Sequence, residues 1–161
     1  MMDLKQISSA SVGRALELGE RYRLLNEPEL AASICRDILV VDPSNQEARR
    51  MLLLALTDLF GRRQGASLPE AEALAAELQS EYDREYYRGI VYERWGRCKL
   101  QEGVPGHVVA EWLQRAMQRY EAAEQVRPTD DDSALLRWNT CQRLLDRLPD
   151  QAREDEGLFG D

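Results

Sequence analysis

Residues 15–43 read ALELGERYRLLNEPELAASICRDILVVDP. In the first part of this stretch the apolar side chains recur at spacings of three and four, which places them on one face of a helix. These side chains are Ala15, Leu18, Tyr22 and Leu25. Asn26 is expected to close this helix, which starts near Ser11, and Pro28 opens a second helix because proline is tolerated in a first helical turn. The buried stripe of the second helix is predicted to be Ala31, Ile34, Cys35, Ile38 and Leu39. The stretch therefore predicts two antiparallel helices that pack on each other.

The next two helices are predicted from the residues that interrupt them. Asp42-Pro43-Ser44-Asn45 ends the second helix and caps a third helix that runs to about Phe60. Residues 61–68 form a loop, and Ser67-Leu-Pro-Glu70 is typical of the capping box that starts a helix. The fourth helix then reaches about residue 82. A turn at residues 80–83 separates it from a fifth helix, although one continuous helix over residues 69–102 is the alternative.

The second half of the chain is divided by Gly103-Val-Pro-Gly106, which breaks any helix. The fifth helix is expected to end near Gln101, and the sixth runs from about His107 to Val126, before Pro128. A seventh helix is predicted within residues 130–147. Residues 148–161 are acidic and contain glycine, so they are expected to form a flexible tail.

The pattern of residues 12–45 resembles a tetratricopeptide repeat, a helix pair of about 34 residues that stacks on neighbouring pairs. The resemblance rests on Leu18-Gly19-x-x-Tyr22, on Ala31 with Cys35 four residues later, and on Pro43 at the end. Gly89-x-x-Tyr92 and Ala116-x-x-x-Tyr120 repeat parts of the motif, whereas residues 46–82 lack its glycine, tyrosine and proline. The resemblance implies an all-α, tetratricopeptide-like α-solenoid in one domain over residues 1–147. Its repeats would be about 12–45, 46–82 and 83–128, with a capping helix at 130–147.

The same resemblance implies a protein-binding role without catalysis. Members of the family generally bind peptides or protein segments in a groove that the first helix of each pair lines. The corresponding groove residues of this chain are Leu16, Glu20, Arg23, Arg50, Leu54, Tyr86, Ile90, Glu93, Arg94 and Arg97. One branch of the family binds a C-terminal carboxylate through lysine and asparagine, but this chain has Leu16 and Glu20 at those positions. We therefore expect acidic segments to bind near Arg94 and Arg97 instead.

Composition excludes several other classes of function. Acidic residues outnumber basic ones by 29 to 21, and the net charge of −8 repels nucleic acid phosphates and anionic lipids. No apolar run approaches the roughly 20 residues of a membrane span, and the first twelve residues lack the apolar core of a secretion signal. The three cysteines are widely spaced, so neither a disulfide framework nor a zinc site is indicated. We expect a cytoplasmic protein without a cofactor or a metal.

The sequence also allows alternatives to a protein-binding adaptor without catalysis. The chain could be a small acidic secretion or assembly chaperone, by analogy with chaperones built from three such repeats. It could form a homodimer through apolar surface left by the irregular second repeat. An enzyme that uses Cys98 as a nucleophile and His107 as its base is less favoured, because a lone histidine after a Pro-Gly turn usually just starts a helix. Tyr86 is the best aromatic candidate for the groove, although core packing is the commoner role of such residues.

Overall fold

A computed structural model describes residues 1–63 and 65–149, and the predicted tail lies almost entirely outside these residues. The described residues form seven α-helices and a short 3-10 turn at Ser9–Ser11, and they contain no β-strand. The prediction of an all-α chain is therefore confirmed. The chain divides into two compact units, Met1–Gln79 and a second unit that begins at Ser80. The prediction of one continuous domain over residues 1–147 stays a prediction.

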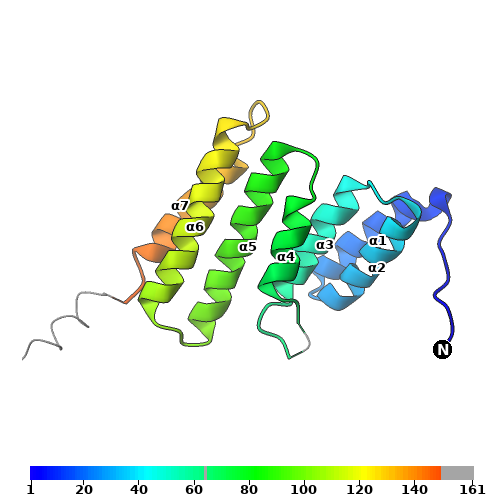
Figure 1. The fold of residues 1–161 in the computed structure, drawn as a ribbon, viewed down its shortest axis with the longest axis horizontal. Helices are drawn as coiled ribbons and strands as arrows, with labels where there is room; N and C mark the ends of the chain where they lie inside the picture. Colours follow the sequence, from blue (N-terminus) through cyan, green and yellow to red (C-terminus); the bar gives the residue numbers. More distant parts are fainter. Residues whose placement is uncertain (64, 150–161) are drawn as a thin grey trace, which may run out of the picture. The chain divides into compact units, whose positions relative to one another are not determined.

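The first unit contains four helices (Figure 1): α1 (Val12–Leu24), α2 (Pro28–Val41), α3 (Gln46–Asp58) and α4 (Leu68–Ala76). The turn between α1 and α2 forms because Asn26 adopts a left-handed conformation with φ of 61°, which asparagine tolerates better than most residues. The Glu27 amide then donates to the Tyr22 carbonyl at 2.9 Å and closes α1. The side chains of Asn45 and Ser67 cap α3 and α4, as the sequence predicts.

The core of the first unit lies among α1, α2 and α3. Small residues on α2 pack against larger apolar residues on α3, and this buried cluster consists of Ala31, Ala32, Cys35, Met51, Leu52, Ala55, Leu56 and Leu59. Gly19 on α1 is also buried, and a Cβ placed there would lie 2.7 Å from the sulfur of Met51. The glycine of the predicted repeat motif thus leaves room for the Met51 side chain of α3.

The second unit contains α5 (Glu81–Gln101), α6 (Gly106–Gln125) and α7 (Ser133–Leu145), which pack in chain order (Figure 1). The hydroxyl of Ser80 accepts a hydrogen bond from the Asp83 amide at 2.9 Å and caps α5. Because α4 ends at Ala76 and α5 begins at Glu81, the alternative of one continuous helix over residues 69–102 is wrong. Gly103, with φ of 79°, makes the turn between α5 and α6.

Two glycines of α5 let α6 pack closely against it. Gly89 faces Tyr120, whose side chain is fully buried, and a Cβ at Gly89 would overlap the tyrosine ring. Gly96 lies two helical turns further along, where a Cβ would come within 3.1 Å of the Cβ of Trp112. The large side chains of α6 therefore fill the space that the missing side chains of α5 leave.

We expect Gly89→Ala to lower the free energy of unfolding by about 1–3 kcal/mol, because the added methyl group would displace the ring of Tyr120 from a filled core. Gly13→Ala in α1 is the matched control, since a Cβ there meets nothing within 4 Å. That control should be neutral or slightly stabilising, because alanine favours a helix more than glycine does. Urea unfolding followed by circular dichroism measures both. Equal midpoints for Gly89→Ala and the wild type would contradict the close approach of α5 and α6.

Candidate functional site

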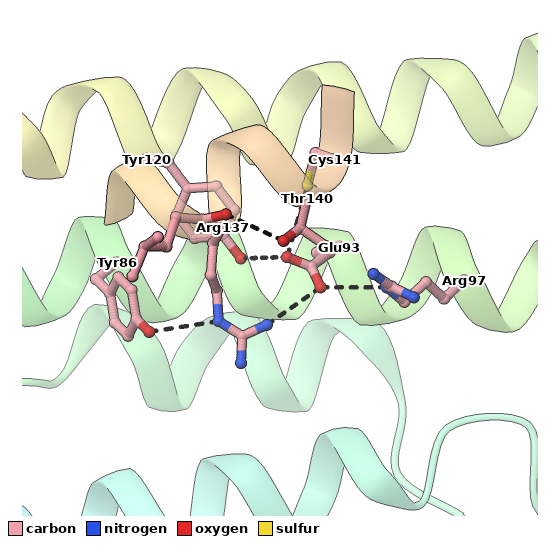
Figure 2. Close-up of polar contacts among 8 residues, drawn as sticks. Tyr86, Glu93, Arg97, Tyr120, Arg137, Thr140 and Cys141 are labelled. Carbon is pink, nitrogen blue, oxygen red and sulfur yellow. Dashed lines mark hydrogen bonds and ion pairs between the residues drawn. The ribbon is translucent and has the colours of Figure 1, made fainter. Parts of the chain in front are cut away.

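A buried carboxylate connects the three helices of the second unit. Glu93 on α5 is only 3% exposed. Its Oε1 accepts hydrogen bonds from the Tyr120 hydroxyl on α6 at 2.9 Å and from the Cys141 thiol on α7 at 3.5 Å. Its Oε2 accepts from Nε of Arg97 at 3.2 Å and from Nη1 of Arg137 on α7 at 3.1 Å. Figure 2 shows these side chains converging on Glu93 from all three helices.

The hydrogen-bond partners of Glu93 engage both of its carboxylate oxygens. A buried charge is costly unless it is paired and hydrogen-bonded, and Glu93 has two cationic partners and two further donors. Burial, followed by the nearby Glu93 charge, raises the pKa of Tyr120 well above its usual value. Tyr120 therefore stays protonated and donates its hydrogen bond. Burial lowers the pKa of Arg137, but Glu93 and the neighbouring tyrosines more than compensate, so the net shift is upward.

Local sequence spacing brings the cluster together. Glu93 and Arg97 are four residues apart on α5, and Arg137 and Cys141 are four residues apart on α7, so each pair lies on one helix face. Nε of Arg137 also donates to the Tyr86 hydroxyl at 3.3 Å. The cluster thus joins α5 to α7 at two points along their length.

Ile90 and Glu93 do not lie where the groove prediction expects them. Ile90 is 2% exposed and Glu93 is 3% exposed, so both belong to the interior. Ile90 and Glu93 are three residues apart on α5, and Glu93 lies on the side of the helix that Gly89 and Gly96 place against α6. A partner protein could not contact either side chain without opening the core.

The other predicted residues of the second unit are half-buried. These are Tyr86, Arg94 and Arg97. Tyr86 lies in an aromatic group, with its ring centroid 5.5 Å from that of Tyr82 and 5.9 Å from that of Tyr120. Tyr86 therefore packs against other aromatic rings of the unit and is also partly accessible to solvent. It is neither a fully buried core residue nor a fully exposed groove residue.

In the first unit the structure brings the predicted residues onto two adjacent helices. Leu16 and Arg23 are half-buried on α1 and Glu20 is exposed, whereas Arg50 and Leu54 are half-buried on α3. The two helices contact each other directly, and Arg23 forms an ion pair with Asp58 of α3 at 3.1 Å. Leu16 also packs against the core cluster. Of the five, Glu20 is therefore the most accessible to a partner.

The Cys98 and His107 pair lacks the features of a nucleophile and its base. The Cys98 thiol donates to Glu102 at 3.6 Å, and burial together with the Glu102 charge raises its pKa. An activated cysteine needs the opposite shift. His107 is exposed in the first turn of α6, and no hydrogen bond joins it to Cys98. Within residues 1–63 and 65–149, no group of three or more histidine, cysteine or acidic side chains could hold a metal ion.

We expect a thiol reagent such as Ellman's reagent to modify Cys98 much faster than the other two cysteines at pH 8. Cys35 and Cys141 are fully buried, and burial raises the pKa of Cys35 to about 12 and also raises that of Cys141. Both thiols therefore stay protonated and inaccessible in the folded chain. Cys98→Ser should remove the fast phase. Rapid modification of all three thiols without denaturant would contradict the described core.

Comparisons with known proteins found no significant match to this chain. No protein-family model matches it, and neither the curated proteins nor the solved structures contain a significant match. Among the helices in the described part of the chain, none combines the length and the apolar character that crossing a bilayer requires.

Proposed function

We propose that this chain is a non-catalytic protein-interaction module of the tetratricopeptide type, which binds a segment of another protein. The proposal rests on the contacts between alternate helices in each unit. In the first unit α1 contacts α3 directly, beside the α1–α2 pair. In the second unit Arg137 of α7 bonds to Glu93 and Tyr86 of α5. In stacked helix pairs, the first helices of neighbouring pairs lie next to each other and together line one face.

We define two surfaces from these helices. The α1/α3 face includes Glu20 and Leu54, and the α5/α7 face includes Tyr86, Arg97 and Arg137. Each face combines a charged group with apolar or aromatic side chains, which suits a peptide better than a small polar metabolite. The three cysteines are free thiols, in keeping with action in the reducing cytoplasm. The net charge of −8 disfavours nucleic acid as the partner.

Co-purification from the native cell tests this function. The face variant carries Glu20→Arg and Arg97→Gln, one change on each surface. The matched control carries Glu29→Arg on α2 and Arg143→Gln on the exposed side of α7, which alters the net charge by the same amount. A protein retained by the wild type and the control but lost from the face variant would support the proposal. Retention of the same proteins by all three baits, or of none by any, would count against it.

A further inference from the structure

Two guanidinium groups of the α5/α7 face are held around a single oxygen. Arg97 and Arg137 both donate to Oε2 of Glu93, at 3.2 and 3.1 Å. One carboxylate cannot neutralise two arginines, so the three groups together carry a charge of +1. Both guanidinium groups contact the same oxygen, so this part of the α5/α7 face carries an excess of positive charge. The surface at Arg97 and Arg137 is therefore electrostatically suited to another carboxylate.

The arginines also retain hydrogen-bond donors for a ligand. Arg97 uses Nε for Glu93, and its two terminal nitrogens have no partner among the described residues. Arg137 uses Nε for Tyr86 and Nη1 for Glu93, and its remaining nitrogen, Nη2, likewise has none there. The side chain of Arg97 is 42% exposed and that of Arg137 is 31% exposed. Both side chains are thus partly accessible to a molecule that approaches from solvent.

The site is organised before any ligand arrives. Tyr120 and Cys141 hold Glu93 through hydrogen bonds to Oε1, and Arg137 is held through hydrogen bonds at two of its nitrogens. Figure 2 shows Arg137 and Arg97 approaching the buried carboxylate of Glu93 from opposite sides. Holding long side chains in place beforehand reduces the entropy lost on binding. It also gives Glu93 a role as a positioning residue, since Glu93 itself is buried.

We propose that Arg97 and Arg137 form a binding position for an aspartate or glutamate side chain in an acidic segment of the partner protein. The proposal rests on the proposed function, because it names the ligand of the α5/α7 face. The chemistry favours a short acidic segment over a polyanion. The chain as a whole is strongly acidic, so a nucleic acid would be repelled at long range while one or two carboxylates could be accepted locally.

A peptide titration of the full-length protein tests the proposal. The probe is a short Gly-Ser peptide with two adjacent glutamates at its centre, and its counterpart has two glutamines there. Binding is followed at low salt by the Nε–Hε NMR signals of the arginines. We expect the glutamate peptide to shift the Arg97 and Arg137 signals and to bind at least about tenfold more tightly than the glutamine peptide, as charge-assisted hydrogen bonds imply. Equal affinities for the two peptides would overturn the proposal.

Matched variants show whether the discrimination comes from this pair. Arg97→Gln with Arg137→Gln should abolish the preference for glutamate, whereas Arg143→Gln with Arg147→Gln removes the same charge from exposed positions near the end of the chain and should preserve it. Preference retained in the first variant would overturn the proposal. If that variant does not fold, Arg97→Gln alone still leaves Glu93 bonded to Arg137 and Tyr120, and it should weaken glutamate binding several-fold.

The two proposals can fail separately. A partner that the face variant loses, combined with no discrimination between the two peptides, would leave the interaction function standing and remove the carboxylate position. Discrimination between the peptides without any partner that depends on the two faces would remove the interaction function instead.

Discussion

Replacing Glu93 with alanine is expected to lower the free energy of unfolding by about 3–5 kcal/mol, the usual effect of removing one member of a buried ion pair. The carboxylate bonds to side chains on α5, α6 and α7, so its loss affects every helix contact of the second unit. The hydroxyl of Tyr120, which is fully buried, would lose its acceptor, and the position of Glu93 would become a cavity. Urea unfolding of the full chain measures the change.

Glu93→Gln separates charge from shape in the same position. The amide oxygen can still accept from Tyr120, but glutamine does not neutralise the two arginines. We therefore expect the free energy of unfolding of Glu93→Gln to lie between those of the wild type and of Glu93→Ala. An alanine variant as stable as the wild type would show that the cluster does not hold the three helices together.

Replacing Leu56 with alanine is expected to lower the free energy of unfolding by about 2–5 kcal/mol, because the substitution leaves a cavity in a packed core. Leu56 lies on α3, is 4% exposed and belongs to the cluster that α2 and α3 share. The size of the effect depends on how far the surrounding helices can collapse into the space. Thermal or urea unfolding detects it.

Leu24→Ala is the control for that prediction, since Leu24 ends α1 in the same unit and is 73% exposed. It should change the stability by less than about 0.5 kcal/mol, as surface substitutions usually do. If the Leu24 and Leu56 variants lost equal stability, the assignment of Leu56 to the core would be contradicted.

The helices were predictable because their signals are local. Asn26, Ser67 and Ser80 act through hydrogen bonds within a few residues of themselves, so the end of α1 and the starts of α4 and α5 follow from the residue types. The end of α4 does not, because the helix stops at Ala76 rather than near residue 82. The buried stripe of α2 follows equally from spacing, with Ala31, Cys35 and Ile38 all fully buried. The division into two units was not predicted, because it depends on contacts between residues far apart in the sequence.

The buried cluster was harder to anticipate. Glu93 falls on the same helical stripe as Ile90, and that spacing was the available sign that its side chain points inward. The groove assignment came instead from the family resemblance, which placed both Ile90 and Glu93 in the groove. Arg137 and Tyr120, which stabilise the buried charge, lie 44 and 27 residues away. No local pattern identifies such partners.

Site-specific photocrosslinking in the native cell tests the interaction function most directly. A photoreactive phenylalanine derivative is placed at Glu20 on the α1/α3 face or at Tyr86 on the α5/α7 face. Control positions are Val40 on α2 and Gln118 on α6, which are both exposed. The account predicts that a partner protein is crosslinked from at least one face position and from neither control. Crosslinks from Val40 or Gln118 alone, or from none of the four positions, would contradict it.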